Sequence, residues 1–310
     1  MIPEAGGRWW NAGLTEVRRV CRLTDEEVRM VEVGHCASFA VPQRGLFVRI
    51  GCVGSESQAA NAVRFAKVCS AMIAGIVEPA EMGFSQPLST QSGPVTFWPL
   101  LESVDGDIDY AWFGATLRSI HDVSGAPMTN EHRQTNPALA ASRLKRLRQA
   151  PYVGDEVVAH CADLMARIRT LRERVLPTLL TGLIHGDAYA ANVVNTPQRP
   201  FLIDYDTAGH GPLYWDLAPI LVSHRRFGTP AAAVDQMFAA YGRDPRDDPA
   251  FWEVVRVREW GAITYLIDLA SADQSYYREL VRRLRTADGA GVWRGLDELR
   301  AEGRLPAGST

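Results

Sequence analysis

The sequence is poor in lysine. Lys67 and Lys145 are its only lysines, and the other 31 of its 33 basic residues are arginines. An arginine does not simply replace a lysine, because a planar guanidinium and a compact ammonium bind anions differently. A reaction that depends on a lysine ammonium therefore has only two candidate residues in this chain.

Cysteine pairs are also lacking. The five cysteines are odd in number and form no Cys-x-x-Cys motif, which argues against a disulfide framework and against a zinc site. We therefore expect a reduced, cytoplasmic protein in which the cysteines serve as small apolar side chains. They are Cys21, Cys36, Cys52, Cys69 and Cys161.

No segment indicates a membrane or a nucleic acid as a partner. The polar N-terminus carries no apolar signal core, and no apolar run is long enough to span a bilayer. The net charge is −3, and the chain has no dense run of basic residues. Neither an anionic membrane surface nor a nucleic acid is therefore an expected partner. The oligomeric state is left open.

What is present is a chain of 310 residues, 46% hydrophobic and 22% charged, enough for one large domain or for two lobes sharing a cleft. Residues 1–30 are predicted to be helical. Apolar segments over 38–41 and 46–50, separated by a turn at 42–45, predict a β-hairpin, and residues 95–98 predict a further strand. Apolar residues at helical spacing predict a helix over 56–74. These elements together predict a small sheet with one main helix.

The rest of the chain has mostly helical periodicity. Asp109 is predicted to cap a helix, long helical patterns run over 137–175, and helices resume at Trp215. Short strands are predicted over 183–184, 192–195 and 201–203. The predicted fold class is therefore α+β, with a small β-sheet lobe over residues 1–99 and a larger helical lobe over residues 100–310.

Three polar side chains lie at the ends of these short strands. Asp187 and Asn192 are five residues apart on either side of a loop, and Asp204 ends the next strand. Phosphoryl transfer needs such a set. One carboxylate orients the attacking hydroxyl and accepts its proton, and oxygen ligands hold Mg²⁺ on the phosphates of ATP. The spacing is that of the protein-kinase catalytic loop, with Gly186 in place of its middle arginine.

Four motifs, in this order, carry a resemblance to a known family. They are His-Gly-Asp-x-x-x-x-Asn at 185–192, Ile-Asp at 203–204, Trp-Asp-Leu-Ala at 215–218 and Ala-Ala-Tyr-Gly at 239–242. The chain resembles the aminoglycoside phosphotransferase and choline kinase superfamily, which has a bilobal protein-kinase-like fold. The resemblance covers nearly the whole chain and is strongest over 183–218.

The resemblance implies a role for each matching residue around the reacting groups. Asp187 would be the catalytic carboxylate, and His185 would brace the catalytic loop through hydrogen bonds. Asn192 and Asp204 would bind Mg²⁺. Asp216 would hold the backbone of the catalytic loop from the helix that follows.

The resemblance also implies a nucleotide site. Phe97, Trp98 and Leu100 would form the hinge against the adenine. Arg49 would stand where the family has its phosphate-binding lysine, and the fork of an arginine can clamp phosphates although it is bulkier. Two interpretations of Arg49 stay open at this point, a phosphate ligand and a solvated charge on a strand.

Other positions depart from the family pattern. The predicted helix over 56–74 has no glutamate at the position that would pair with the phosphate-binding cation, since Glu56 lies near its start and Asn61 is the nearest polar alternative. The phosphate loop at residues 34–38 contains a single glycine. Asp206 could support the site as a second metal contact or simply form a turn.

Three other functions compete with a kinase. A haloacid-dehalogenase-type phosphatase with Asp204 as its nucleophile would need a downstream lysine, and none follows Lys145. A metallophosphoesterase would need a Gly-Asn-His motif, which the sequence lacks. A degenerate kinase fold that binds nucleotide without turnover is favoured by Arg49 and by the missing glutamate, but it has little need of Asp187, Asn192 and Asp204 together.

The sequence thus predicts a phosphotransferase that uses ATP and Mg²⁺ and transfers the γ-phosphate to a hydroxyl of a small molecule. An aminoglycoside or another antibiotic is one class of acceptor, but choline, sugars and amino alcohols are served by the same fold. Acceptor pockets lie on the helical lobe, where the sequence pattern carries the least information.

Overall fold

A computed structural model describes residues 9–24, 27–34, 36–125, 128, 137–296 and 298–299. The chain divides into two compact units, one within residues 1–132 and 182–211 and the other within 133–181 and 212–310. Residues 1–8 and 25–26 of the predicted N-terminal helical region lie outside the described residues, as does residue 35 of the predicted phosphate loop.

The first unit contains a five-stranded antiparallel sheet in the order β1-β2-β3-β5-β4. Its strands are β1 (Arg29–Val33), β2 (Cys36–Val41), β3 (Leu46–Gly51), β4 (Leu88–Thr90) and β5 (Gly93–Pro99). The predicted hairpin is confirmed as β2 and β3. Its turn is the short 3₁₀ helix η2 (Pro42–Arg44) followed by Gly45, whose φ of 60° favours a residue without a Cβ.

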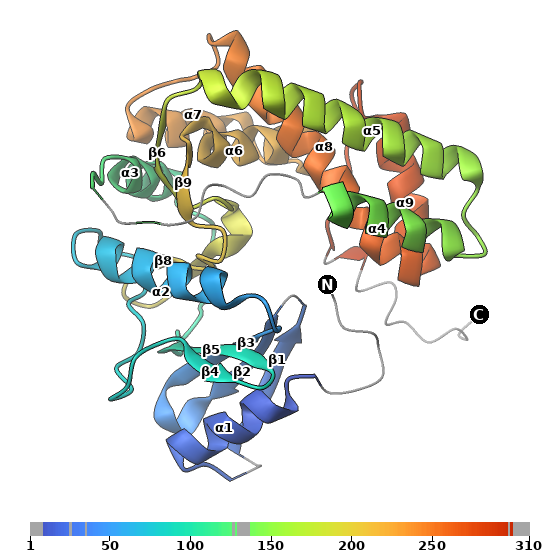
Figure 1. Ribbon diagram of the computed structural model, residues 1–310. Helices are drawn as coiled ribbons and strands as arrows, with labels where there is room; N and C mark the ends of the chain where they lie inside the picture. Colours follow the sequence, from blue (N-terminus) through green and yellow to red (C-terminus); the bar gives the residue numbers. More distant parts are fainter. Residues whose placement is uncertain are drawn as a thin grey trace. The chain divides into compact units, whose positions relative to one another are not determined.

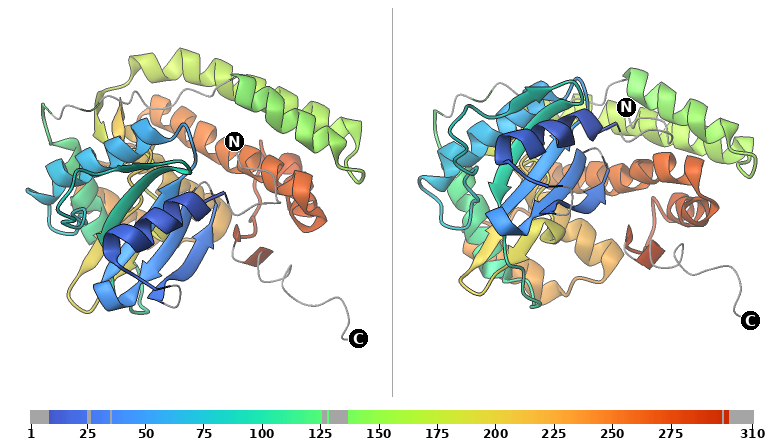
Figure 2. Two further views of the ribbon diagram at one scale, coloured as in Figure 1. Left: turned by 60° about the horizontal axis from the view of Figure 1, so that its bottom comes forward. Right: turned by 90° about the horizontal axis from the view of Figure 1, so that it is seen from below.

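The two faces of this sheet differ in polarity because side chains alternate along each strand. One face packs against α1 (Asn11–Cys21) in a core of fully or nearly fully buried side chains. That core includes Leu14, Val17, Phe39, Val48, Ile50, Val95 and Phe97. The other face carries Arg49 opposite Thr96, with Trp98 two residues further along β5. Figure 1 shows α1 and α2 (Glu56–Ser70) on opposite faces of the sheet, and the left view of Figure 2 shows α1 lying across it.

Two predicted elements in this unit end earlier than the sequence pattern suggested. The helix predicted over 56–74 ends at Ser70. In the predicted N-terminal helical region, α1 ends at Cys21, where Arg22 adopts a left-handed φ of 53°. Residues 29–33 then form the edge strand β1, which pairs antiparallel with the next strand, β2.

In the rest of the first unit, α3, β6, β7 and β8 lie where elements were predicted, whereas β9 was not predicted. Asp109 caps α3 (Tyr110–His121) by accepting a hydrogen bond from the Trp112 N–H at 2.9 Å. Two short ladders come next: β6 pairs with β9, and β7 pairs with β8. Their strands are β6 (Thr181–Ile184), β7 (Val193–Asn195), β8 (Pro200–Leu202) and β9 (Gly209–Pro212).

The second unit is helical, and α8 is central to it because α4, α5, α6 and α9 all pack against α8. Its helices are α4 (Pro137–Gln149), α5 (Asp155–Val175), α6 (Tyr214–Phe227), α7 (Ala231–Tyr241), α8 (Pro249–Ala272) and α9 (Gln274–Arg285). Buried charges are paired, as between Arg226 and Glu259 at 3.0 Å. In the described part of the chain, no helix is both long and apolar enough to cross a membrane.

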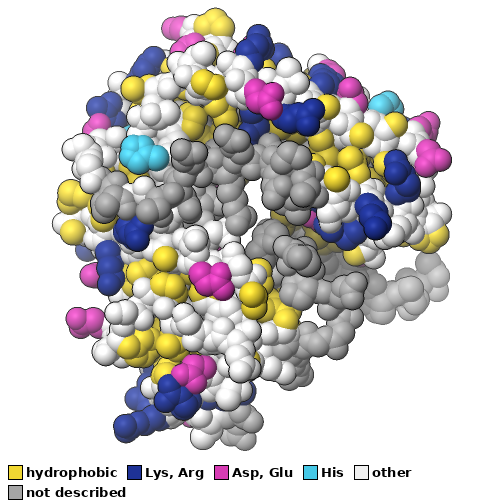
Figure 3. Space-filling view, in the orientation of Figure 1, with side chains coloured by type: hydrophobic (Ala, Val, Ile, Leu, Met, Phe, Trp, Pro, Cys, Tyr) yellow, Lys and Arg dark blue, Asp and Glu magenta, His cyan; other side chains and the backbone are white. Residues whose placement is uncertain are grey.

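The predicted α+β fold class is confirmed by these elements. The predicted lobe boundary between residues 99 and 100 falls where β5 ends, and the lobes themselves stay a prediction. On the face that Figure 3 shows, acidic and basic side chains are interspersed, as the small net charge leads one to expect.

The apolar core beneath the sheet should dominate the stability of the first unit. We predict that Val48→Ala lowers the free energy of unfolding by about 2–3 kcal/mol, because it removes two buried methyl groups and leaves a cavity. Val53→Ala removes the same groups from a side chain that is 71% exposed, and it should change stability by no more than about 0.5 kcal/mol. Denaturant melts of both variants test this, and equal losses would contradict it.

Candidate functional site

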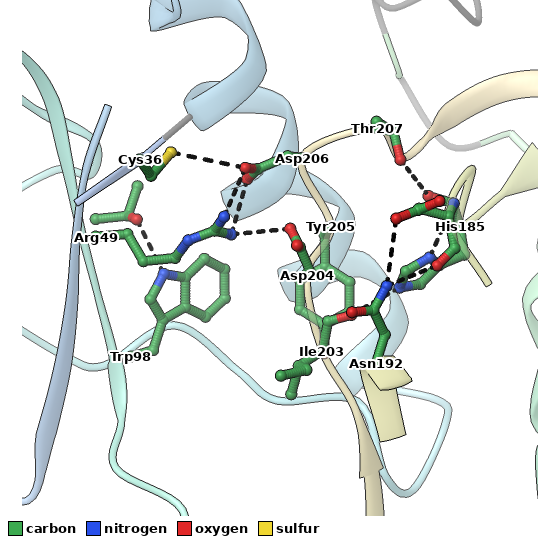
Figure 4. A network of polar contacts seen from close by, with 12 residues as sticks. Cys36, Arg49, Trp98, His185, Asn192, Ile203, Asp204, Tyr205, Asp206 and Thr207 are labelled. Atoms are coloured by element: carbon green, nitrogen blue, oxygen red, sulfur yellow. Dashed lines mark hydrogen bonds and ion pairs between the residues drawn. The ribbon is translucent and has the colours of Figure 1, made fainter. Parts of the chain in front are cut away.

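The loop after β6 is held by a buried histidine. The His185 side chain is completely inaccessible to solvent. Its Nε2–H donates to the carbonyl oxygen of Ile203 at 2.9 Å, and the backbone N–H of Asp187 donates to Nδ1 at 3.3 Å. Both ring nitrogens are therefore used in hydrogen bonds, and the pattern matches the tautomer that carries its proton on Nε2. Figure 4 shows the ring between the loop and the segment that begins at Ile203.

Gly186 lies where two backbone segments cross. Its φ is +86°, and a Cβ built on it would lie 2.3 Å from the carbonyl oxygen of Thr207. No side chain fits at that distance. The glycine that replaces the arginine of the protein-kinase loop is thus required by close backbone packing.

Asp187 and Asn192 are joined across the loop. The Asn192 amide nitrogen donates to the Asp187 carbonyl oxygen at 2.8 Å and lies 3.5 Å from the carboxylate Oδ2. With its nitrogen engaged, Asn192 offers its amide oxygen to a ligand. The backbone N–H of Ile203 donates to the Asn192 carbonyl at 2.9 Å, so that Asp204 follows directly beside the loop.

Asp204 occupies an unusual backbone conformation. Its φ is +67°, and apart from Arg22 it is the one non-glycine residue with positive φ in the described part of the chain. The left-handed region is costly for most L-residues, and aspartate and asparagine tolerate it best. Asp204 follows β8 after one intervening residue, Ile203, and its side chain is 39% exposed.

Tyr205 anchors the segment that carries Asp204, and sequence reasoning did not identify it. Its hydroxyl donates to the Leu202 carbonyl and accepts the Val77 N–H at 2.9 Å. Its ring lies 5.2 Å from the Phe65 ring of α2, 5.7 Å from His185 and 5.8 Å from Trp98. The available signal in the sequence was a large aromatic residue between Asp204 and Asp206, where the two aspartates suggested a polar motif.

Arg49 is not a solvated charge on a strand. Its side chain is 19% exposed, and its guanidinium contacts two carboxylates. Nη1 donates to Asp204 Oδ1 at 3.0 Å and to Asp206 Oδ1 at 2.9 Å, and Nη2 donates to Asp206 Oδ2 at 2.7 Å. Figure 4 shows this fork between β3 and the segment from Ile203 to Thr207. The acidic partners that the sequence did not supply from α2 come from this segment.

The paired charges change the local acid–base properties. Burial disfavours the charged guanidinium, but the attraction of Asp206 and Asp204 outweighs it and raises the pKa of Arg49. Burial and the neighbouring Asp206 raise the pKa of the Cys36 thiol to about 12. Cys36 is therefore a neutral thiol near pH 7, and its Sγ lies 3.8 Å from Asp206 Oδ2 as a weak donor.

The predicted hinge residues lie in different environments. Phe97 is fully buried in the core on the α1 face, with its ring 5.7 Å from that of Phe84. Trp98 lies on the Arg49 face, 7% exposed, and its Nε1–H donates to Thr96 Oγ1 at 2.9 Å. The Leu100 N–H donates to the Gly45 carbonyl at 2.7 Å. Of these residues, Trp98 has the ring that shares a face with Arg49.

Asp216 belongs to the second unit. It lies in the first turn of α6 and is fully buried. An acidic side chain at this position favours the helix, because the N-terminal end of a helix carries partial positive charge. Its predicted support of the catalytic loop stays a prediction.

The oxygen donors near the loop fit a magnesium ion. Mg²⁺ prefers hard oxygen ligands and is usually held by one or two carboxylates together with substrate phosphates. Asp204 and Asn192 supply one carboxylate and one amide oxygen from neighbouring segments. Among the described residues, no group of three or more His, Cys, Asp or Glu side chains could hold a metal ion.

Comparison with known proteins identifies the family. Residues 77–254, more than half of the chain, match the family described as the phosphotransferase enzyme family. The protein belongs to this family, and the predicted membership of the aminoglycoside phosphotransferase and choline kinase superfamily is confirmed. No curated protein sequence matches the chain.

Three solved structures share the fold at low sequence identity. A choline/ethanolamine kinase family protein from Mesorhizobium loti is 16% identical, with a TM-score of 0.58 over 94% of this chain and 95% of that one. Spectinomycin phosphotransferase APH(9)-Ia, solved with ADP and spectinomycin, is 14% identical, with a TM-score of 0.55 over 90% and 89%. Amicoumacin kinase hAmiN, solved with AMP-PNP and Ca²⁺, is 11% identical, with a TM-score of 0.58 over 88% and 92%.

The backbone crossing at Gly186 yields a prediction with a matched control. Gly228 has a similar φ of +80°, but no atom lies within 4 Å of a Cβ built there. Gly228→Ala should therefore cost only the left-handed strain, about 1–2 kcal/mol. Gly186→Ala adds the collision with Thr207 and should cost about 2–5 kcal/mol in total. Denaturant unfolding of the two variants measures the difference, and similar losses would show that the backbone around Gly186 yields readily to a methyl group.

Proposed function

We propose that this protein transfers the γ-phosphate of ATP to a hydroxyl group of a small molecule. One observation carries the proposal. Within one unit, hydrogen bonds bring together the loop that bears Asp187 and Asn192 and the segment that bears Asp204. A binding module or a structural protein has little need of these three groups at one place.

Asp187 is the proposed catalytic carboxylate. It is half-buried, and its position is fixed by Asn192 and His185. It orients the acceptor hydroxyl, whose oxygen bonds to the γ-phosphorus while the bond to the β–γ bridging oxygen breaks and ADP leaves. The proton of the hydroxyl passes to the Asp187 carboxylate. His185 takes no part in this proton transfer, because both of its nitrogens are used in holding the loop.

Asp204 and Asn192 are the proposed ligands of Mg²⁺. The ion would supply charge neutralisation on the phosphates. One carboxylate oxygen of Asp204 accepts from Arg49, which leaves the other for the metal. One carboxylate and one neutral amide oxygen would hold the ion loosely, so that much of its coordination would be left to phosphate oxygens and water.

Arg49 and Trp98 are proposed to contact the nucleotide. They share one face of the sheet, and the Arg49 guanidinium contacts Asp204, the carboxylate that would hold the metal. Phe97 contributes to this site by filling the core beneath β5, with Leu100 at the end of the strand. Asp216 is proposed to support the catalytic loop, and the free cysteines accord with the proposed cytoplasmic location.

A second candidate is a kinase fold that binds nucleotide without turnover. The contact between Arg49 and Asp204 favours it, because a guanidinium on the metal ligand competes with a divalent cation. Consumption of ATP with and without an acceptor separates the two functions. Turnover that depends on a hydroxylated acceptor would support the kinase. Tight nucleotide binding with no turnover for any acceptor would support the binding module.

The related structures named above suggest which acceptors to test. They are named for choline or ethanolamine, spectinomycin and amicoumacin. We predict that a screen of amino alcohols, sugars and aminoglycoside or other antibiotics by coupled ADP release will find at least one acceptor that stimulates turnover. A mass shift of one phosphate on that acceptor would establish the reaction. ADP release that no acceptor stimulates would contradict the proposal.

The proposed roles of Asp187 and Asp204 predict different failures. Asp187→Asn should leave Mg·ATP binding intact and reduce turnover by about 10²–10⁴-fold, because its carboxylate acts on the acceptor in the transition state. Asp204→Ala should weaken metal-dependent nucleotide binding as well as turnover, because the metal loses its one carboxylate ligand. Asn192→Ala should resemble a milder form of Asp204→Ala. Isothermal titration with Mg·AMP-PNP and single-turnover kinetics measure the two effects.

A matched control for these variants is Asp122→Asn. Asp122 is an exposed aspartate that pairs with Arg118 on the surface of α3, and its substitution should change neither quantity. Normal nucleotide binding by Asp204→Ala together with lost binding by Asp187→Asn would reverse the two roles. A phosphorylated Asp204 trapped during turnover would instead support the phosphatase mechanism.

A further inference from the structure

Helix α2 offers no carboxylate to Arg49. The one acidic residue among residues 56–70 is Glu56, which lies exposed in the first turn and accepts a hydrogen bond from the Gly54 N–H at 3.2 Å. The buried face of the helix is formed by Asn61, Ala62, Val63, Phe65, Ala66 and Cys69. An ionic partner that positions Arg49 therefore has to come from another part of the chain.

Asp206 meets this requirement by its geometry. Its two carboxylate oxygens accept from the two terminal nitrogens of Arg49, at 2.9 Å and 2.7 Å. Two parallel contacts of this kind fix the plane of a guanidinium as well as its distance, which a single contact cannot do. The Asp206 side chain is 29% exposed, so that the pair is largely shielded from water.

The surroundings of Asp206 hold it in place. Tyr205, the preceding residue, is buried between Phe65, Trp98 and His185. The Cys36 thiol, neutral at physiological pH, lies against Oδ2 of Asp206 from the start of β2. The Asp206 carboxylate is thus supported by its own segment, through the buried Tyr205, and by Cys36 of the sheet.

The guanidinium retains donors for a nucleotide. Of its five N–H groups, three point at Asp204 and Asp206. The Nε–H and one Nη2–H are not used by these three contacts. A cation whose plane is fixed from one side and that keeps N–H groups outside this contact can receive phosphate oxygens.

We propose that Asp206 is the positioning residue for Arg49, and that it aims the guanidinium at the nucleotide phosphates in place of an acid on α2. This inference rests on the proposed function in one respect, that ATP binds here. In this proposal Asp206 acts through Arg49, whose guanidinium binds both of its oxygens, and not as a ligand of the metal.

A double-mutant cycle tests the inference. The variants are Asp206→Asn, Arg49→Met and both together, and the quantity is the dissociation constant of Mg·AMP-PNP. Asp206→Asn should raise it about 10-fold, equivalent to ~1.4 kcal/mol, with a larger effect on KM for ATP than on kcat. In the Arg49→Met background the same substitution should have no further effect, because the residue through which Asp206 acts is gone. Asp206→Glu should restore part of the affinity, since it keeps the carboxylate.

Control variants distinguish a positioning role of Asp206 from a metal-binding role and from a role of α2. Glu56→Gln removes the one acid of α2 and should leave the affinity unchanged. If Asp206→Asn does not fold, the double variant removes both buried charges and is the one expected to fold. Its affinity is then compared with that of Arg49→Met alone. Mn²⁺ binding followed by electron paramagnetic resonance, without nucleotide, should be no weaker in the double variant than in Arg49→Met.

The outcomes separate this inference from the proposed function. Additive losses from the two substitutions, or weaker Mn²⁺ binding in the double variant, would overturn the inference and make Asp206 a metal ligand. A loss of affinity in Glu56→Gln would return the positioning role to α2. A wild-type chain that binds no Mg·AMP-PNP would overturn the proposed function, and this inference with it.

Discussion

The buried ring of His185 is the contact on which the candidate site depends. It joins the loop after β6 to the segment after β8 through Ile203, and both ring nitrogens are used in doing so. Gly186 allows the two backbones to cross, and Tyr205 packs against the same ring. Because the ring joins these segments, Asp187 and Asp204 are held in the same region of the first unit.

A second constraint is electrostatic. A largely buried guanidinium must be compensated, and in this chain two carboxylates from one short segment compensate it. The same contacts join β3 to the segment that carries the proposed metal ligand. The two terminal nitrogens of Arg49 bind both oxygens of Asp206, a contact that the point charge of a lysine could not make in the same way. The fork of Arg49 thus fits the carboxylate of Asp206 that faces it.

The sequence pattern predicted the polar residues of the motif better than the packing of the apolar residues around it. Spacing alone placed Asp187, Asn192 and Asp204 near strand ends, and the short strands β6, β7 and β8 lie where apolar runs predicted them. Apolar segments and a turn signal likewise predicted β2, β3 and β5. The pattern was weaker for β1, all of whose residues are exposed and which pairs with β2 at the edge of the sheet. Phe97 shows the same limit, because alternation gives two faces but does not say which one packs against α1.

By itself, the sequence determined the α+β class, most of the helices and strands, and the three polar groups of the motif, because periodicity and fixed spacing are local properties of a chain. It did not predict β1, β4 or β9. Only the tertiary structure decided the partner of Arg49. Asp206 lies 157 residues away, and no local pattern distinguishes an aspartate that forms a turn from one that holds a buried cation. The role of Tyr205 was decided in the same way, by rings from α2 and β5 that meet it only in the folded chain. Long-range pairing of charges and rings depends on which surfaces meet, and that is a property of the packed molecule.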